Sequence, residues 1–367
     1  MGPIVRGRPL RAAGGVRSVR VSEALKYSGR MLRSRLWGRP TLVLANIYPT
    51  FRCNLRCTYC NFPLIGTREL ETGQWLTIIG ELASMGCRRV NIQGGEPLLR
   101  PDLPELIEHI RKMGMSCVLA SNGLLVSQQI QKLGRVSTLV LSLDAAGPAN
   151  DAVRGAGVFQ AVQDAVAAAR NSHIPVKVNA VLSAKTAAGL DGLLAFAQAQ
   201  DLFLTVNIMR AGAPELWKDA ARIKDDDEEI RRTLGRLAGL SRKNFRILFS
   251  EGVYRYAARW PDYSRDRLTA DELTAAERAR LDPPRCQAGR FYISVTPDGS
   301  TWPCVATIGK VRGGNVVGDG LSDCWKRLAG HDCLACYSAC LVELNYLFSL
   351  KPRVLTGFLT RHLARFA

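Results

Sequence analysis

The sequence predicts an α/β protein in which about six strand–helix units build one parallel sheet. Between residues 41 and 210, short apolar runs alternate with segments of helical periodicity. Connections of this kind are right-handed and keep the strands parallel, and six units fall short of the eight that close a barrel. The expected strands are 41–48, 89–93, 117–121, 139–144, 176–182 and 204–209, and the expected helices are 71–85, 103–113, 126–133, 157–171 and 187–199.

Composition sets the broad class. The 367 residues allow one large domain and a smaller one, and 47% hydrophobic residues suffice for a packed core. Lys+Arg 50 against Asp+Glu 32 gives a net charge of +18, which favours an anionic partner such as a phosphate-bearing ligand, nucleic acid or a lipid headgroup. We find no secretory signal pattern and no apolar run of ~18 to 20 residues, so we expect a cytoplasmic protein with reduced cysteines.

The first chemically distinctive stretch is Cys53-Asn54-Leu55-Arg56-Cys57-Thr58-Tyr59-Cys60, directly after the first expected strand. Three thiolates spaced C-x3-C-x2-C can converge on one iron–sulfur cluster. No fourth cysteine is near, since Cys87 lies beyond the next expected helix. A four-iron cluster here keeps one iron free for another ligand, as catalytic metal sites do. The alternatives are a zinc knuckle, which needs a second cysteine pair or histidines at fixed spacing, or three core cysteines.

This motif, with Tyr59 before its last cysteine, resembles the signature of the radical S-adenosylmethionine (radical SAM) superfamily. The resemblance implies an open, partial (β/α)6 parallel barrel and a [4Fe–4S] cluster with an open iron site on Cys53, Cys57 and Cys60. It also implies that S-adenosylmethionine (SAM) binds that iron and is reductively cleaved to a 5′-deoxyadenosyl radical. The enzyme then abstracts hydrogen from a substrate carbon, as an oxidoreductase or a transferase-type C–H modifier, with an electron donor such as flavodoxin or ferredoxin.

Further motifs follow later strands, where the active sites of such barrels gather. Gly94-Gly95-Glu96-Pro97 resembles the GGE motif of the superfamily, which implies that its backbone and acid hold the SAM amino group. Ser121-Asn122 ends the third strand, and the resemblance implies a contact with the SAM ribose or carboxylate. Both stretches are also ordinary turn sequences.

The fourth strand ends with Ser142 and Asp144, and the segment after it, 150–155, resembles a D-x-x-R-G sequence of relatives with auxiliary clusters. Arg154 is predicted either to meet the SAM carboxylate or a substrate anion as a forked donor, or to form a salt bridge at a helix entry. Asn179 and Asn207 follow on later strands, and no role is assigned to them.

A second group of cysteines begins with Cys286 and Cys304, which flank an expected hairpin with a Pro297-Asp298-Gly299 turn. The spacing C-x12-G-x4-C followed by C-x2-C resembles the SPASM/Twitch extension that binds auxiliary [4Fe–4S] clusters. The resemblance implies one auxiliary cluster in a small hairpin-plus-helix domain, with a structural zinc on the last three cysteines as the alternative. The expected ligands are Cys286, Cys304, Cys333 and Cys336, with Cys340 able to displace one, whereas Cys87, Cys117 and Cys324 are expected in the core.

We expect five segments: a basic amphipathic stretch 1–40, the barrel 41–211, a charged helical connector 212–285, the auxiliary cluster domain 286–340 and a basic amphipathic tail 341–367. A helix over 22–36 either lies on an anionic membrane surface, which would make the protein peripheral on the inner membrane, or packs across the open side of the barrel. The first segment has one acid, Glu23, against ten basic residues: Arg6, Arg8, Arg11, Arg17, Arg20, Lys26, Arg30, Arg33, Arg35 and Arg39.

The substrate expected from these features is a small molecule, in particular a membrane-borne lipid or isoprenoid. Relatives that modify peptides often carry a sizeable recognition domain before the barrel, where this chain has a short basic segment. The first alternative is a SPASM-type peptide maturase that takes its substrate from a separate carrier. The second is a non-catalytic iron–sulfur protein that binds nucleic acid, but the aromatic and basic interleaving of a strand-binding groove is missing. Nucleic acid is therefore not the expected partner.

Overall fold

The computed structural model describes residues 40–210, 227–244, 246–331 and 333–349. The helix expected over 22–36 and the later part of the expected tail, 350–367, lie outside the described residues. Within the described ranges, no helix is both long and apolar enough to cross a membrane. The membrane-surface interpretation of the two ends therefore stays a prediction.

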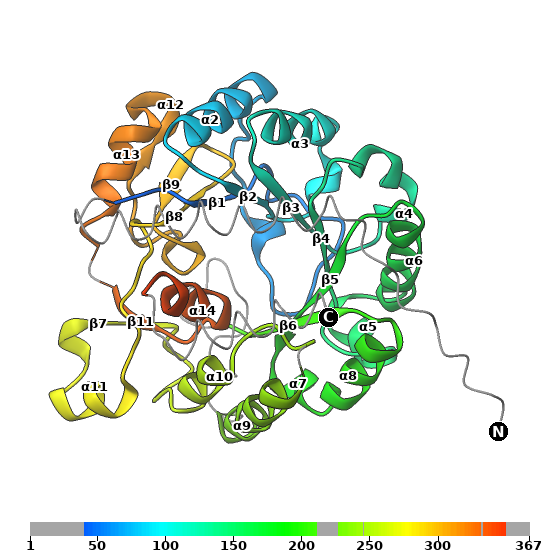
Figure 1. Cartoon of the computed structure of the whole chain (residues 1–367), viewed down its shortest axis with the longest axis vertical. Coiled ribbons are helices and arrows are strands. Elements are labelled where there is room, and N and C mark those ends of the chain that lie inside the picture. Colours follow the sequence, from blue (N-terminus) through cyan, green and yellow to red (C-terminus); the bar gives the residue numbers. More distant parts are fainter. Residues whose placement is uncertain (1–39, 211–226, 245, 332, 350–367) are drawn as a thin grey trace.

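Six parallel strands form an arc in the order β1-β2-β3-β4-β5-β6, as the alternating sequence pattern predicts (Figure 1). Each strand pairs with its neighbours in the chain, which is the arrangement that right-handed strand–helix units produce. The strands are β1 (Leu44–Ile47), β2 (Arg89–Ile92), β3 (Ser116–Ser121), β4 (Thr138–Ser142), β5 (Val176–Leu182) and β6 (Phe203–Ile208).

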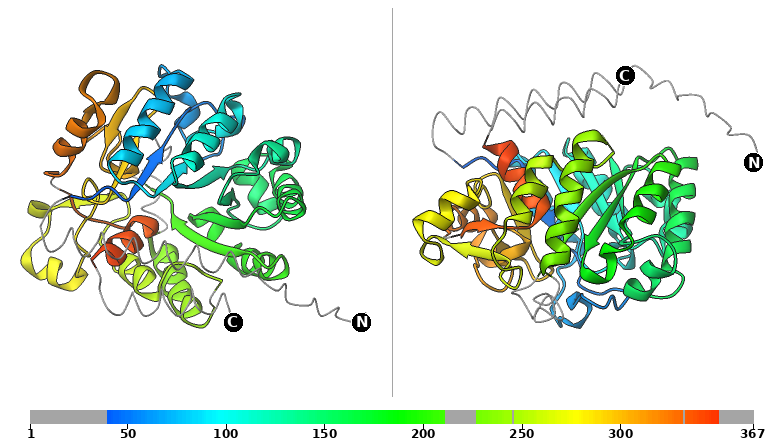
Figure 2. Two further views of the ribbon diagram at one scale, coloured as in Figure 1. Left: turned by 45° about the horizontal axis from the view of Figure 1, so that its top comes forward. Right: turned by 90° about the horizontal axis from the view of Figure 1, so that it is seen from below.

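The helices between these strands cover the outer face of the arc (Figures 1 and 2). In the first of them, Trp75, Ile78, Ile79 and Leu82 are buried, because their spacing places them on one face of the helix. These helices are α2 (Thr72–Ser84), α3 (Leu103–Lys112), α4 (Val126–Gln129), α5 (Pro148–Arg154), α6 (Val158–Asn171), α7 (Ala184–Ala187) and α8 (Leu190–Ala199), with short 3₁₀ turns η1 (Phe62–Leu64), η2 (Pro97–Leu99) and η3 (Ile130–Leu133).

The expected hairpin exists, but it continues the barrel sheet. Its first strand, β8 (Tyr292–Val295), runs parallel to β1, with Leu44 opposite Tyr292. The second strand, β9 (Ser300–Trp302), and the two-residue β10 (Gly314–Asn315) extend the same sheet to the order β10-β9-β8-β1-β2-β3-β4-β5-β6. The hairpin thus covers the edge of β1, whose backbone groups need partners.

The charged connector contains packed helices as well as a polar surface. In α9 (Asp227–Lys243), Ile230, Leu234 and Leu237 are buried. In α10 (Glu251–Ala258), the Tyr254 hydroxyl donates to the carbonyl oxygen of Val206 on β6 at 3.3 Å. The elements that follow are β7 (Arg267–Thr269), η5 (Ala270–Glu272), α11 (Ala275–Leu281), η6 (Val305–Thr307), α12 (Val316–Asp319), α13 (Leu321–Leu328) and β11 (Cys333–Cys336).

The last described helix, α14 (Ala339–Phe348), lies at the open side of the arc (Figure 1). The Cys340 amide donates to Asn207 Oδ1 on β6 at 3.0 Å, and the Tyr292 hydroxyl of β8 donates to Asn345 Oδ1 at 3.0 Å. Helix α14 therefore bridges the two ends of the barrel. The beginning of the expected amphipathic tail is in fact a core helix, since Leu341 and Phe348 are buried.

Candidate active site

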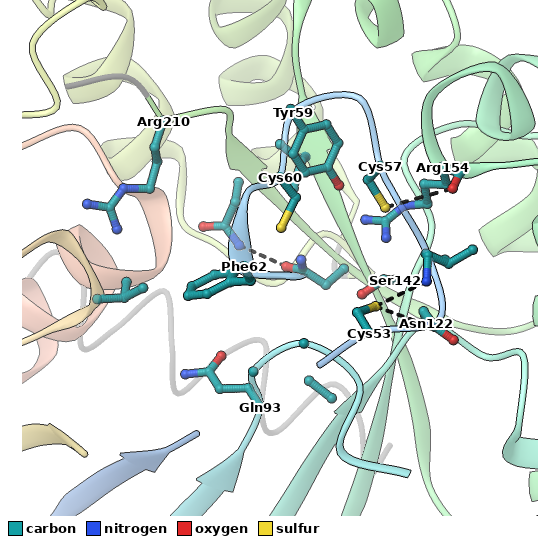
Figure 3. Close-up of a pocket in the computed structure, with 18 of the residues that line it drawn as sticks. Cys53, Cys57, Tyr59, Cys60, Phe62, Gln93, Asn122, Ser142, Arg154 and Arg210 are labelled. Atoms are coloured by element: carbon teal, nitrogen blue, oxygen red, sulfur yellow. Dashed lines mark hydrogen bonds between the residues drawn. The ribbon is translucent and has the colours of Figure 1, made fainter. Parts of the chain in front are cut away.

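One cavity of about 260 Å³ lies at the carboxyl ends of the strands, where the sequence places its motifs (Figure 3). The loop after β1 and the ends of β2 to β6 supply most of its wall, and η6 and the start of α14 supply the rest. The wall includes the following predicted site residues: Cys53, Cys57, Tyr59, Cys60, Gly94, Gly95, Ser121, Asn122, Ser142, Arg154 and Cys340. The sequence analysis thus singles out 11 of the 25 lining residues, although it assigns Cys340 to the auxiliary cluster.

The first three cysteines, Cys53, Cys57 and Cys60, are named here the triad, and all three line this cavity. Their loop turns back on itself, because the Cys60 amide donates to the Cys57 carbonyl oxygen at 3.1 Å. Burial and, to a smaller extent, the charges of Cys57 and Cys53 raise the pKa of the Cys60 thiol to about 11. Because each thiolate opposes the ionisation of the next, the triad is suited to a cationic group that takes all three as anions.

A buried ion pair fixes the loop from behind. The Tyr59 hydroxyl donates to Asp144 Oδ2 at 2.9 Å, and Arg154 Nη2 donates to Asp144 Oδ1 at 2.9 Å. Arg154 Nε lies 2.8 Å from Asp144 Oδ2. Of the two roles predicted for Arg154, this geometry favours the salt bridge, formed at the carboxyl end of α5 rather than at a helix entry. Arg154 still lines the cavity beside Cys57, whereas Asp144 is absent from its wall.

The glycine pair after β2, Gly94 and Gly95, packs against the backbone of the loop between β1 and the triad. A Cβ on Gly94 would lie 2.3 Å from the Thr50 carbonyl oxygen, and a Cβ on Gly95 would lie 2.1 Å from the Arg52 carbonyl oxygen. Gly94 also has a φ of +145°, a conformation that side chains disfavour. The Glu96 amide donates to the same Arg52 oxygen at 2.8 Å. The turn therefore requires glycine to hold the segment just before Cys53.

Glu96 itself lies behind the cavity wall. Its carboxylate is fully buried and accepts hydrogen bonds from the Asn122 amide at 2.8 Å, the Leu98 amide at 3.1 Å and the Ser121 hydroxyl at 3.1 Å. Burial raises its pKa to about 7, and these hydrogen bonds oppose the rise. Pro97 is buried beside it, at the first position of η2. In this structure Glu96 joins the ends of β2 and β3, and neither it nor Pro97 is among the residues that line the cavity.

Asn122, directly after β3, donates a side-chain hydrogen bond to the triad. Its Nδ2 lies 3.7 Å from Cys53 Sγ (Figure 3). The same nitrogen donates to Asn54 Oδ1 at 2.7 Å. A hydrogen bond to a ligating sulfur orients the ligand and tunes the metal. The turn sequence at this position therefore supports the cluster loop as well as ending β3.

The second group of cysteines comes together from distant segments. Cys286, Cys304, Cys333 and Cys336, named here the quartet, include two side chains, Cys304 and Cys336, that are over nine-tenths buried. A hydrogen bond with Cys286 raises the pKa of the Cys333 thiol well above its usual range. Burial raises the pKa of Cys336, and the charges of Cys333 and Cys304 raise it further. Four thiols that oppose each other's ionisation again suit a shared cationic group.

Cys340 lies on the wall of the strand-end cavity. It lines the cavity from the first turn of α14, and its amide donates to Asn207 Oδ1 on β6 at 3.0 Å. That Cys340 displaces a quartet ligand stays a prediction. The expected core cysteines Cys87, Cys117 and Cys324 are buried.

Both thiol groups suit a cluster better than a single ion. Within the described ranges, no group of three or more His, Cys, Asp or Glu side chains could hold one metal ion. Thiolates on one zinc all lie about 2.3 Å from it and so meet around a point. A four-iron cluster has its own extent, and its thiolates bind separate irons. The zinc alternatives are therefore not supported.

The cavity wall also contains residues that the sequence analysis missed. Tyr48 and Gln93 directly follow β1 and β2, and Gln93 Nε2 donates to the Tyr48 hydroxyl at 3.0 Å. Arg210 follows β6 and is over nine-tenths buried. Figure 3 shows Arg210 on the side of the cavity away from Cys53, Cys57 and Arg154. Its position just after a strand end was the available signal.

Comparisons with known proteins agree with this arrangement. A model described as the Radical SAM superfamily matches residues 47–185. The PqqA peptide cyclase of Xanthomonas euvesicatoria pv. vesicatoria is 30% identical over 295 residues, which cover 75% of this chain and 72% of that protein. The PqqA peptide cyclase of Streptomyces rochei is 38% identical over 152 residues, covering 40% of this chain and 41% of that protein.

Two solved structures share the fold. Streptococcus suis SuiB bound to precursor peptide SuiA has a TM-score of 0.59 at 17% identity, covering 89% of this chain and 72% of that one. Native anSMEcpe with bound AdoMet and Cp18Cys peptide has a TM-score of 0.59 at 18% identity, covering 87% and 99%. The predicted partial parallel barrel and the predicted family are confirmed. The chain belongs to the radical SAM superfamily, as an enzyme with a SPASM/Twitch-like extension whose cofactors are a [4Fe–4S] cluster and S-adenosylmethionine.

Proposed function

We propose that this enzyme abstracts hydrogen from a carbon of a peptide substrate. The observation that carries the proposal is the triad on the wall of the strand-end cavity, where a cluster bound to three thiols keeps one iron open to the remaining space. The relatives supply the substrate class, since one is named for cyclising the peptide PqqA and a structural neighbour is bound to a precursor peptide.

The small-molecule or lipid interpretation has less support. It depended on the basic N-terminal segment, which lies outside the described residues. The relatives and the solved neighbours named above include a peptide cyclase and two complexes with peptides. We therefore favour the peptide alternative, and an anionic membrane contact stays an untested prediction.

In this proposal Cys53, Cys57 and Cys60 hold the first [4Fe–4S] cluster. The wall that includes Gly94, Gly95, Asn122 and Ser142 would hold SAM, with the two polar side chains available as hydrogen-bond partners. Bound together and reduced by a donor such as flavodoxin or ferredoxin, these cofactors supply the 5′-deoxyadenosyl radical. The buried pair of Asp144 and Arg154 holds the loop rigid. The radical is therefore kept at a fixed position relative to the substrate carbon.

The far wall of the cavity suits a peptide backbone. Asn179 Oδ1 accepts from Asn207 Nδ2 at 2.8 Å and from the Thr205 hydroxyl at 2.9 Å. The side-chain nitrogen of Asn179, Nδ2, has no hydrogen-bond partner among the described residues. A side-chain amide held in this way presents a donor to a substrate carbonyl oxygen. We therefore assign Asn179 to orienting the substrate.

The quartet is the proposed ligand set of one auxiliary [4Fe–4S] cluster. Four thiols satisfy four irons, so this cluster has no open position. Such a closed cluster exchanges electrons and leaves substrate binding to the cavity. We place Cys340 on the cavity wall and outside this ligand set.

The substrate class is tested by deuterium transfer. Cells that produce the protein are grown in heavy water, and their extract is divided into a peptide fraction and a lipid fraction. Each fraction is incubated with SAM and the reconstituted, reduced enzyme, and 5′-deoxyadenosine is analysed by mass spectrometry. We expect deuterium in the nucleoside from the peptide fraction, abolished by prior protease treatment. Deuterium from the lipid fraction alone would overturn the peptide assignment in favour of the lipid alternative.

A further inference from the structure

Arg210 is a buried cation with two unused donors. It stands directly after β6 and is 7% exposed. Its Nη2 donates to Asp266 Oδ2 at 2.7 Å, and Asp266 is itself 2% exposed. The Nε and Nη1 atoms are shielded from solvent and have no hydrogen-bond partner in the described part of the chain. Buried charged donors are normally paired, so these two nitrogens indicate an acceptor that the polypeptide does not supply.

The position of Arg210 points to the quartet as the source of that acceptor. Asp266, its partner, directly precedes β7, and β7 pairs with β11, the strand that carries Cys333 and Cys336. The Tyr337 hydroxyl, on the residue after Cys336, donates to the carbonyl oxygen of Met209, the residue before Arg210, at 3.1 Å. The end of β11 therefore lies beside the segment that carries Arg210.

A carboxylate of the substrate is an alternative acceptor for Arg210, since this side chain also lines the cavity. The two free nitrogens are closed to solvent, however, so a ligand entering from the cavity does not reach them without moving the side chain. Asp266, which accepts from Arg210, directly precedes Arg267, and Arg267 lies opposite Cys336 in the pairing of β7 with β11. The geometry thus favours the quartet side.

We infer that Arg210 donates hydrogen bonds to the sulfur atoms of the auxiliary cluster and raises the reduction potential of that cluster. The inference rests on the proposed quartet as its ligand set. A reduced cluster carries one more negative charge than an oxidised one, so a nearby cation stabilises the reduced form. Hydrogen bonds to the sulfurs act in the same direction and are among the features that set such potentials. Arg210 is thus a positioning residue, and Asp266 partly neutralises it.

The test is a redox titration of the full-length protein with both clusters, followed by electron paramagnetic resonance. Arg210→Gln should lower the midpoint potential of the auxiliary cluster by at least about 59 mV, which corresponds to a tenfold change in the equilibrium constant of a one-electron reduction. Arg210→Lys keeps the charge and should give a smaller shift. Asp266→Asn removes the opposing charge and should shift the potential upward. Arg327→Gln, which removes a charge from α13 at a side chain 53% exposed, should leave the potential unchanged.

A measurement without substitution complements these variants. Protein labelled with ¹⁵N in its arginines should show a ¹⁵N hyperfine coupling to the reduced auxiliary cluster in pulsed resonance spectra. Unchanged potentials in Arg210→Gln and Asp266→Asn, without this coupling, would overturn the inference. If Arg210→Gln loses iron, the inference is judged by the potential of Asp266→Asn and by the ¹⁵N coupling in the labelled wild-type protein.

Failure of the inference and failure of the proposed cluster give different results. If the wild-type protein binds about four irons in place of about eight, the auxiliary cluster is absent and the ligand assignment fails. If eight irons bind but the potential does not follow the charge of Arg210, the cluster stands and the role of Arg210 fails. A loss of affinity for the substrate peptide in Arg210→Gln, at unchanged potential, would instead assign the arginine to a substrate carboxylate.

Discussion

The triad and the quartet differ in chain topology and in exposure. The triad occupies eight consecutive residues in one loop, and all three of its cysteines are partly exposed to the cavity. The quartet draws on the segment before β8, the start of η6 and strand β11, and two of its cysteines are buried. A local loop leaves one side of a cluster free for a cosubstrate. In our proposal the quartet encloses its cluster, since two of its thiols are buried and its members come from several segments.

This difference supports our proposal that the two regions have separate tasks. The open site is positioned by short-range contacts, namely the Asp144–Arg154 pair and the hydrogen bond from Asn122 to Cys53. The closed site depends on long-range contacts such as the pairing of β7 with β11 and of β8 with β1. Chemistry on SAM should therefore depend on the triad alone, whereas electron exchange should depend on the quartet.

The largest effect is expected from Cys57→Ala in the triad. Mutation of a residue that hydrogen-bonds to a metal ligand typically lowers metal affinity or activity by about 10–100-fold. Loss of a ligand itself should therefore lower 5′-deoxyadenosine formation by more than about 100-fold. The measurement is the nucleoside yield from SAM with reduced, reconstituted protein. Cys324→Ala removes a buried thiol outside both groups and should keep the wild-type yield. A normal yield from Cys57→Ala would refute the triad assignment.

The quartet is tested by Cys304→Ala. We expect bound iron to fall from about eight to about four per chain, because one four-iron cluster is lost. Cleavage of SAM without a peptide should persist, since the triad is intact, but peptide modification should stop. Iron analysis and nucleoside yield are measured on the same sample. Equal loss of both activities with full iron content would mean that the two sites do not act separately.

The glycine turn should matter for the triad loop and little elsewhere. Gly95→Ala places a Cβ 2.1 Å from the Arg52 carbonyl oxygen, and we expect overpacking to cost about 1–3 kcal/mol or more. Gly73→Ala is the matched control, since nothing lies within 4 Å of its Cβ and alanine favours helix α2. Thermal unfolding and iron content are measured for both. Equal melting temperatures for the two variants would contradict the close approach.

The smallest expected effect is a pH dependence from Glu96. Its pKa of about 7 in the folded state lies above the value of 4.5 for a glutamate in the unfolded chain, so the folded state keeps a proton that the unfolded state has lost. The stabilisation from this proton is therefore complete below about pH 4.5 and is lost above about pH 7. Between these values the free energy of unfolding falls by at most about 1.4 kcal/mol per pH unit. Denaturant unfolding of Glu96→Gln between pH 5 and 8 should show a flatter profile. An identical slope in both proteins would refute this assignment.

The sequence was sufficient for the barrel and for the triad. The alternation of apolar runs locates β1 to β6, because fully buried parallel strands read as short apolar segments between helical patterns. The C-x3-C-x2-C spacing needs no long-range information, since its thiols are brought together by one loop. The glycine pair was found for the same reason, although the contact with the Arg52 carbonyl oxygen appears only in three dimensions.

Long-range features were harder to predict. The pairing of β8 with β1 joins residues that are far apart in the chain, and nothing local marks which edge of the sheet is free. The position of Cys340 followed from α14 crossing the open side of the barrel, which its spacing from Cys336 does not reveal. Arg210 was missed because one basic residue in a chain with 50 Lys+Arg has no distinguishing pattern until its burial is seen.

The most direct test of an open and a closed cluster is the resonance spectrum of a variant in which Cys53, Cys57 and Cys60 are all alanine. We predict that it keeps about four irons per chain and that its reduced signal does not change on addition of SAM, whereas the wild-type signal does. Loss of all iron, or a SAM-dependent signal from the remaining cluster, would contradict the assignment of the triad as the SAM-binding site and the quartet as the closed one.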